Sequence, residues 1–156
     1  MNASQVMDTQ PSTLKPDDKV EFAVHYIMDK RYRSLPVVDE EGCYLGMFGV
    51  NCLLKQVIPK AVFMQRGLKN VSFIHESLGE LYTRYEAARE QAISMCMSTD
   101  IKPVAPDTPL TEILLQLHDT GHSIPVVEPG SCKLLGMISY WDVGQQILQA
   151  GKTSDA

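Results

Sequence analysis

The sequence predicts a mixed α/β (α+β) fold in which one β-α-β-β-α unit occurs twice. Two pairs of matching segments carry this prediction. Arg-Ser-Leu-Pro-Val-Val at 33–38 corresponds to His-Ser-Ile-Pro-Val-Val at 122–127, and Leu-Gly-Met-Phe at 45–48 corresponds to Leu-Gly-Met-Ile at 135–138. The two pairs keep one order along the chain, with shifts of 89 and 90 residues. Segments that recur in this way indicate a duplicated structural unit.

Local patterns predict the elements of the first unit. A helix is expected to begin at Asp17 or Asp18, since either side chain can cap it and apolar residues recur behind them at helical spacing. Two short apolar strands follow at 35–38 and 44–50, separated by an acidic turn that ends in glycine. A second helix is expected from about Asn51 to the residue before the next proline. The apolar residues of the first helix are Val20, Ala23, Val24, Tyr26 and Ile27.

The second unit repeats this order. Thr108 followed by Pro109 favours a helix start, and Gly121 favours its end. The turn at 128–131 leads into a strand at 134–139 and then into a last helix. The apolar face of the first helix in this unit consists of Leu110, Ile113, Leu114 and Leu117.

The repeat boundaries divide the chain into four parts. The two units occupy residues 4–58 and 94–149, a partly helical connector occupies 59–93, and the tail at 150–156 is expected to fray. Within the connector, Ser77-Leu78-Gly79-Glu80 has the spacing of a capping box, so a helix is expected behind it. Its apolar stripe can pack on the repeats, which is favoured, bind a partner helix or support a dimer. The stripe consists of Leu78, Leu81, Tyr82, Tyr85, Ala88 and Ala92. The apolar residues of the preceding segment, which the pattern leaves unassigned, are Phe63, Met64, Val71, Phe73 and Ile74.

Composition limits the possible functions. The 156 residues carry a formal charge of −5, which argues against nucleic acid or an acidic membrane as a partner. No apolar run approaches 18 residues, so no membrane span is expected. Without a signal peptide or a Cys-x-x-Cys pair, the four cysteines are expected to be reduced thiols of a cytoplasmic protein. These residues are Cys43, Cys52, Cys96 and Cys132.

The sequence offers no pattern typical of an enzyme or a metal site. We find no nucleophile–base set and no paired carboxylates in a plausible cleft, so no catalytic residue and no required cofactor are expected. His118 and His122 lie four residues apart, but Gly121 between them is expected to end the helix, which argues against a metal site.

The segment 136–143 contains a pair of polar residues at a strand–helix junction. Ser139 and Asp142 lie one helical turn apart, on the same edge of the expected helix. The pair resembles a capping box, which this segment alone favours. It also fits a ribose-binding pair, because an ionised carboxylate is a pure acceptor for the two hydroxyls of a ribose.

Taken together, these motifs resemble the cystathionine-β-synthase (CBS) domain, and the tandem arrangement resembles a Bateman module. The resemblance rests on the two Pro-Val-Val strands, the two Pro-Asp helix starts and the segment Gly136 to Asp142. It implies two units packed sheet against sheet as a pseudo-twofold pair, with two clefts between them. It also implies a regulatory module that forms homodimers, acts on a partner protein and binds an adenosine-containing ligand such as AMP, ADP, ATP or S-adenosylmethionine.

The resemblance assigns roles to residues around a first cleft. Ser139 and Asp142 would hold the ribose, with Ile138 at the end of the strand before them. Arg33 and Ser34 would face phosphate, although Arg33 also fits the solvated end of the basic run 30–33. Residues of the other unit would lie beside the base, and these are Gln10, Pro11 and Ser12.

The second cleft departs from the family pattern. Gly49 and Cys52 stand where the second unit has Ser139 and Asp142, so the ribose-binding groups are missing. We therefore predict one good site per chain and a second cleft that is weak, empty or adapted to another ligand. His122 would make its occupancy pH-sensitive, or is an ordinary residue at a strand start. The remaining residues that the resemblance places at this cleft are Asp100, Ile101, Lys102 and Ser123.

A rival hypothesis explains the same motifs without a ligand. In it the chain is a protein-interaction or dimerisation scaffold with a vestigial nucleotide cleft, acting through the connector helix and a dimer face. Titration with adenosine ligands separates the two hypotheses.

Overall fold

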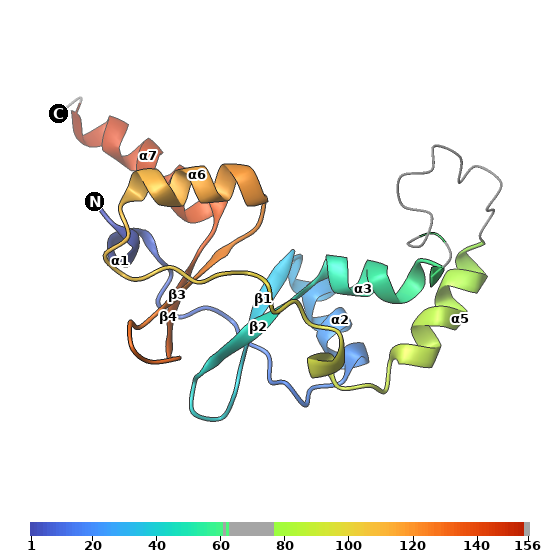
Figure 1. Cartoon of the computed structure of the whole chain (residues 1–156). Coiled ribbons are helices and arrows are strands. Elements are labelled where there is room, and N and C mark those ends of the chain that lie inside the picture. The colour runs from blue at the N-terminus through green and yellow to red at the C-terminus, as the bar shows by residue number, and fades with distance from the viewer. Residues whose placement is uncertain (61, 63–76, 155–156) are drawn as a thin grey trace.

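The computed structural model describes residues 1–60, 62 and 77–154, and it contains two similar α+β units side by side (Figure 1). Each unit has a two-stranded antiparallel sheet. The first unit contains α2 (Val20–Lys30), β1 (Ser34–Val38), β2 (Tyr44–Gly49) and α3 (Val50–Val57). The second contains α6 (Leu110–Thr120), β3 (Ile124–Val127), β4 (Leu134–Ile138) and α7 (Tyr140–Ser154). The predicted fold class, with two repeats, is confirmed.

The first strand of each predicted β-α-β-β-α unit is reduced to one bridging residue. Leu14 pairs in parallel with Val37, and Val104 pairs in parallel with Val126. In each case the backbone makes two hydrogen bonds, such as Leu14 N to Pro36 O and Val38 N to Leu14 O, both at 2.9 Å. Each bridge therefore adds a third, single-residue partner to a two-stranded sheet.

The two units exchange the segments that precede them, which we call the leading segments (residues 2–8 and 91–98). The first contains the short helix α1 (Ala3–Val6) and pairs with the second unit, where Asp8 bridges Met137. The second contains the 3₁₀ helix η1 (Ile93–Met95) and pairs with the first unit, where Ser98 bridges Met47. Each leading segment therefore completes the sheet of the other unit, which ties the repeats together.

Two hydrophobic cores follow this exchange. The first unit's core includes Phe48, Val37 and Ile93, and the second unit's includes Ile138, Ile113 and Ala3. Ile93 and Ala3 are both 0% exposed, so each leading segment contributes a fully buried residue to the opposite core. Removing either segment would expose apolar surface in the other repeat.

Two helix starts differ from the predictions. The N-cap of α2 is Lys19, and the N-cap of α6 is Pro109; neither makes a side-chain cap hydrogen bond. Asp18 instead accepts the backbone N–H of Lys15 at 2.8 Å through its carboxylate. Thr108 is also displaced from the cap, and its carbonyl accepts the N–H of Ala3. The Asp18 carboxylate therefore binds a local turn and does not cap α2.

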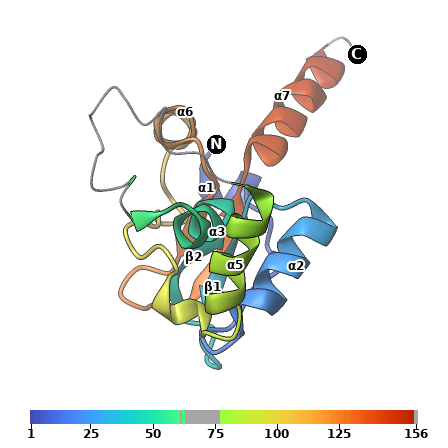
Figure 2. The ribbon, with the colours of Figure 1, turned by 90° about the vertical axis from the view of Figure 1, so that its right-hand side faces the viewer.

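The connector helix α5 (Leu78–Ala88) begins at the predicted capping box, in which the hydroxyl of Ser77 accepts the N–H of Glu80 at 3.2 Å. The helix contacts α3 and crosses it, as Figure 2 shows. Its Arg84 Nε donates to the carbonyl of Val57 at 2.6 Å. Ala88 is buried, whereas Leu78 and Tyr82 are exposed. Packing within the chain therefore uses only part of the predicted stripe, and the apolar residues at 63–74 lie outside the described residues.

Helix α7 extends away from the body of the molecule (Figure 2). It continues to Ser154, so the chain stays helical past residue 150, where we expected fraying. None of the helices in the described part of the chain is long and apolar enough to cross a membrane.

The prediction of four reduced thiols is wrong for two of them, because Cys43 and Cys132 form a disulfide. The two residues occupy equivalent positions in the hairpins of the two repeats, 89 residues apart. The pseudo-twofold arrangement brings these hairpins together, with Tyr44 N donating to Cys132 O at 2.8 Å. Cys52 and Cys96 are free thiols.

Candidate functional site

A cavity of about 270 Å³ lies between the two repeats at the start of α7. The residues after the first leading segment form one wall, the stretch between α2 and β1 forms another, and the junction of β4 with α7 closes it. Seven of the eight residues that we assigned to the first cleft line this cavity. They are Gln10, Pro11, Ser12, Arg33, Ser34, Ser139 and Asp142.

Ile138 is the exception. It is 0% exposed and belongs to the core of the second unit. Its neighbours Met137 and Ser139 line the cavity. Side chains alternate between the two faces of a strand, so a residue between two cavity residues must face the core. The assignment of Ile138 to the cavity wall is therefore corrected.

Ser139 and Asp142 form a closed hydrogen-bonded pair at the start of α7. Asp142 Oδ2 accepts the backbone N–H of Ser139 at 2.7 Å and its hydroxyl at 2.8 Å. Ser139 Oγ in turn accepts the N–H of Asp142 at 3.3 Å. Among the described residues, no donor reaches Asp142 Oδ1. The pair therefore caps the helix and still presents one carboxylate oxygen as an acceptor.

On the side contributed by the first unit, the cavity is lined by two arginines, Arg31 and Arg33. Arg31 ends α2 with a φ of 57°, the only positive φ outside glycine in the described residues. The equivalent position in the second unit is Gly121, with a φ of 72°. An arginine in this backbone conformation costs more than a glycine, by about 1 kcal/mol. Arg31 belongs to the basic run 30–33 of the sequence, and the structure places it in the lining of the cavity.

Three aromatic residues line the cavity, and the sequence reasoning missed them as site residues. Tyr32, Tyr140 and Trp141 all line it, and Trp141 is 80% exposed. Tyr32 stacks on Tyr26 with ring centroids 6.3 Å apart, and its hydroxyl lies 3.4 Å from Ser12 Oγ. The position of Trp141 inside the Ser-x-x-Asp motif was the available signal. An exposed aromatic face suits stacking on a planar base.

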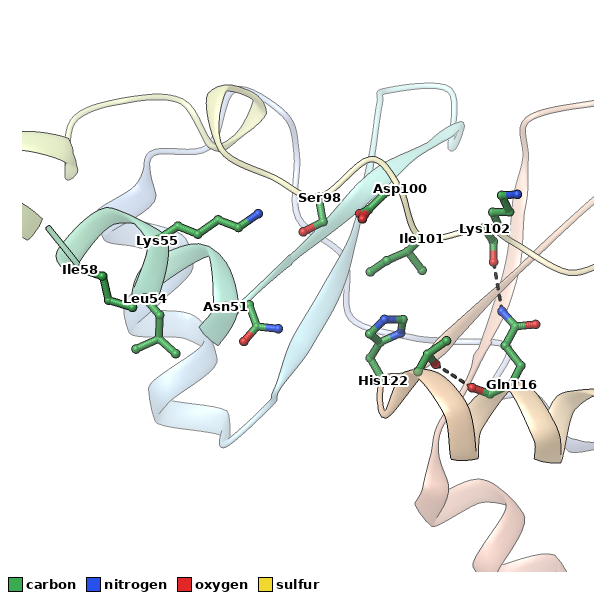
Figure 3. Close-up of a pocket in the computed structure, with 11 residues that line it drawn as sticks. Asn51, Leu54, Lys55, Ile58, Ser98, Asp100, Ile101, Lys102, Gln116 and His122 are labelled. Atoms are coloured by element: carbon green, nitrogen blue, oxygen red, sulfur yellow. Dashed lines mark hydrogen bonds between the residues drawn. The ribbon is translucent and has the colours of Figure 1, made fainter. Parts of the chain in front are cut away.

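The second cleft contains a larger cavity of about 770 Å³ and, adjoining it, a smaller one of about 200 Å³. Figure 3 shows Asn51 and Lys55 of α3 on one side and His122 and Gln116 on the other. Four of the assigned residues line the larger cavity, namely Asp100, Ile101, Lys102 and His122. Gly49 and Cys52 line the smaller one.

Ser123 lies in a different place from the one assigned to it. It lines the first cavity, whereas its neighbour His122 lines both cavities of the second cleft. Successive side chains of an extended backbone point to opposite sides, so the two residues face different clefts. Ser123 is therefore removed from the second cleft.

The structure explains why the second cleft lacks a ribose-binding pair. A Cβ at Gly49 would meet the carbonyl of Arg33 and would lie 2.7 Å from Ser34 Cβ, so a serine does not fit there. Cys52 is 2% exposed and belongs to the first core. Its Sγ lies 3.9 Å from both Met47 O and Ser98 Oγ. Packing therefore determines the residue type at both Gly49 and Cys52.

The larger cavity nevertheless carries polar groups of its own. In Figure 3 the Lys55 side chain extends towards Ser98, and Asp100 lies beyond Ser98. Lys102 accepts a hydrogen bond through its carbonyl from Gln116 Nε2 at 3.4 Å. His122 Nδ1 is buried and has no hydrogen-bond partner among the described residues. Asn51, Lys55, Gln116 and Thr120 were not assigned from the sequence.

Tyr44 provides a pH-dependent contact beside this cleft. Its hydroxyl donates to Ile101 O at 3.1 Å. Burial, and then the Asp100 carboxylate, raise the pKa of Tyr44 from 10.0 to about 12. The folded pKa lies above the unfolded one, so this contribution to stability is full below pH 10 and is lost as the pH rises towards 12.

We therefore expect alkaline destabilisation that depends on Tyr44. The free energy of unfolding in urea should fall by about 1–2 kcal/mol between pH 9.5 and 11.5 through this group. Tyr44→Phe should reduce that fall, and Tyr82→Phe, at an exposed tyrosine, should leave it unchanged. Equal pH dependence in wild type and Tyr44→Phe would contradict this assignment.

These observations define a tandem-repeat module with two clefts between its halves. The family model described as CBS domain matches the chain twice, over residues 3–58 and 91–147. The chain belongs to the CBS domain family and is a CBS-pair module. A comparison with curated proteins finds no match.

Solved structures share this fold. The CBS-pair protein CBSX2 from Arabidopsis thaliana is 19% identical, with a TM-score of 0.75 and coverage of 97% of this chain and 96% of that one. CBSX2 in complex with AMP is 20% identical, with a TM-score of 0.69 and coverage of 96% and 98%. A CBS domain-containing protein from Bacillus anthracis is 13% identical, with a TM-score of 0.71 and coverage of 96% and 94%.

Proposed function

We propose that this CBS-pair module binds an adenosine nucleotide in the cavity beside Ser139 and Asp142 and passes the bound state to a partner protein. One observation carries the proposal. The Ser139–Asp142 pair of one repeat and Arg31 and Arg33 of the other line the same cavity of about 270 Å³. An acceptor pair and two cations from different repeats match the two polar ends of a nucleoside phosphate.

Each part of the nucleotide has a candidate partner. Asp142 Oδ1 accepts from the ribose hydroxyls, and Arg33 donates to phosphate as a planar fork. The N–H groups in the first turn of α7 favour an anion nearby. Gln10 and Pro11 lie beside the base, and Trp141 offers an aromatic face. We infer a binding role without catalysis and without a required cofactor.

A ligand in this position would act on the relative arrangement of the repeats. It contacts both halves, so it favours the arrangement in which both walls reach it. A partner protein that distinguishes this arrangement would bind differently with and without ligand, and the effect would be reciprocal. The AMP complex of CBSX2 supports the choice of an adenosine nucleotide.

Isothermal titration with AMP, ADP, ATP and S-adenosylmethionine tests the proposal. We expect saturable binding of at least one of them at one molecule per chain. Two equivalent molecules per chain would contradict the inference of a degenerate second cleft. No heat and no thermal shift with any of the four would overturn the nucleotide proposal and leave the scaffold hypothesis.

Arg33 and His122 occupy equivalent positions in the two repeats and provide a matched pair of variants. Arg33→Ala should weaken AMP binding about tenfold, because a charge-assisted hydrogen bond at an exposed site contributes roughly 1–1.5 kcal/mol. His122→Ala, at the other cleft, should change the Kd less than twofold. Equal effects would show that the two clefts do not differ in the predicted way.

A specific observation favours the scaffold as a second candidate. Ile147 and Leu148 on the projecting part of α7 are 61% and 71% exposed, next to Trp141. An apolar face of this kind suits a second copy of the chain or a partner protein. Sedimentation of wild type and Leu148→Glu tests it. A dimer that dissociates in the variant supports a dimer face on α7, and monomers in both cases contradict it.

A further inference from the structure

The disulfide between Cys43 and Cys132 joins the two repeats at equivalent points. Both residues lie just before the second strand of their hairpins, with their Cα atoms 4.8 Å apart. Two backbone hydrogen bonds flank the bond, from Tyr44 N to Cys132 O at 2.8 Å and from Leu134 N to Gly42 O at 3.0 Å. In Figure 1 the two hairpin turns point to the same side of the molecule.

The strands that leave this disulfide lead directly to the two clefts. β4 runs from Leu134 to Ile138, and Ser139 of the nucleotide cavity follows it. β2 runs from Tyr44 to Gly49, which lines the second cleft. A strand of five residues spans about 17 Å, so each strand connects the disulfide to a cleft over that distance. The disulfide therefore sits at one end of two strands whose other ends form the clefts.

Solvent can reach this disulfide, and the other two cysteines are poorly placed to interfere with it. Cys132 is exposed, and Cys43 is half-buried. Cys52 is buried in the first core. Burial raises the pKa of the Cys96 thiol to about 11, so this thiol stays protonated at neutral pH.

We propose that Cys43 and Cys132 form an exchangeable disulfide through which a dithiol reductant controls nucleotide binding in the first cavity. In the disulfide form the two hairpins are held together, and the walls that carry Ser139 and Arg33 are fixed relative to each other. In the dithiol form the repeats stay joined by their exchanged leading segments but move more freely. A site that must first be ordered binds its ligand more weakly. The nucleotide part of this proposal rests on the function proposed above.

The exchange step balances with a dithiol as the only co-reactant. One thiolate of the reductant attacks Sγ of Cys132, the Cys43–Cys132 bond breaks, and a mixed disulfide forms. Cys43 leaves as a thiolate and takes up a proton. The second thiol of the reductant, as a thiolate, then attacks the reductant sulfur that is bonded to Cys132. Cys132 leaves as a thiolate and takes up a proton. The dithiol loses two electrons and two protons and becomes a disulfide.

Counting thiols in the denatured full chain tests the bond itself. After mild oxidation with oxidised glutathione, we expect two reactive thiols per chain, from Cys52 and Cys96, and four after dithiothreitol. Reduction should lower the Tm by roughly 5–15 °C, since the bond closes a loop of 89 residues. Cys43→Ser should melt like the reduced protein in both conditions. Four thiols after oxidation, or an unchanged Tm, would overturn the proposal.

Titration with AMP in both redox states tests the coupling. We expect a Kd 3- to 10-fold higher after reduction, no redox dependence in Cys43→Ser, and full dependence in Cys96→Ser. An equal Kd in both states, with the disulfide shown to form, would overturn the coupling. Absence of AMP binding in both states would overturn the proposed function and the coupling with it. The thiol count and the Tm report on the bond independently of the ligand.

Discussion

Asp142→Ala is expected to weaken AMP binding about 30- to 100-fold, the largest loss from any single side chain in the first cavity. The carboxylate is an acceptor for the ribose hydroxyls, and charge-assisted hydrogen bonds contribute roughly 2–3 kcal/mol. The same carboxylate caps α7, since Oδ2 accepts both donors of Ser139. The variant should therefore also lose about 1 kcal/mol of stability. Isothermal titration and thermal melts measure the two effects separately.

Asp142→Asn separates the two roles of this residue. An asparagine caps a helix about as well as an aspartate, so the Tm should stay close to that of wild type. Its amide has one acceptor oxygen and no charge, so binding should still fall at least tenfold. If Asp142→Asn binds AMP as wild type does, the carboxylate does not hold the ribose and the pair is only a helix cap.

The equivalent residue of the first repeat gives a matched control. Cys52 stands where the second repeat has Asp142, but it is buried in the core. Cys52→Ala should leave AMP binding within twofold of wild type and cost about 1 kcal/mol of stability, because it removes a small buried side chain. A large loss of binding in this variant would mean that the second cleft contributes to the same site.

The duplication could be recognised in the sequence because the matched segments are the two paired core strands of each unit. The Pro-Val-Val strand and the Leu-Gly-Met strand pair with each other in both halves. Residues that form paired core strands vary little in kind between two copies of one fold, so they reveal the repeat. The walls of the first cavity were expected from the resemblance to the CBS domain, which places Ser139 and Asp142 opposite Arg33.

The sequence did not show which cleft each strand-end side chain faces, nor which hairpins of the two repeats touch. Ile138 and Ser123 were assigned one residue away from positions that face the first and second clefts, and a shift of one residue in extended backbone turns the side chain to the other side. Cys43 and Cys132 are separated by the same shift as the two repeats, and this equivalence was visible in the sequence. Nothing in the pattern showed that the hairpins meet at the pseudo-twofold axis. Only contact between the repeats brings two such thiols within bonding range.

Gly46→Ala and Gly136→Ala are expected to destabilise the protein by about 2–3 kcal/mol each, since overpacking at a rigid contact forces backbone to move. A Cβ at Gly46 would lie 2.5 Å from Ser98 O, and one at Gly136 would lie 2.6 Å from Asp8 O. Each contact is with the leading segment that the other repeat contributes. Urea unfolding measures the loss, and Gly144→Ala is the control.

Gly144 lies inside α7, where a Cβ would meet no neighbouring atom within 4 Å, so its alanine variant should gain about 0.5–1 kcal/mol. The two core variants should also differ from each other in ligand binding. Gly136→Ala displaces Asp8, and the residues after it, Gln10 to Ser12, line the nucleotide cavity, so AMP binding should weaken. Gly46→Ala displaces Ser98, which lines the second cleft, so AMP binding should change little. If both variants changed AMP binding equally, the leading segments would stabilise the two repeats, but neither segment would shape one particular cleft.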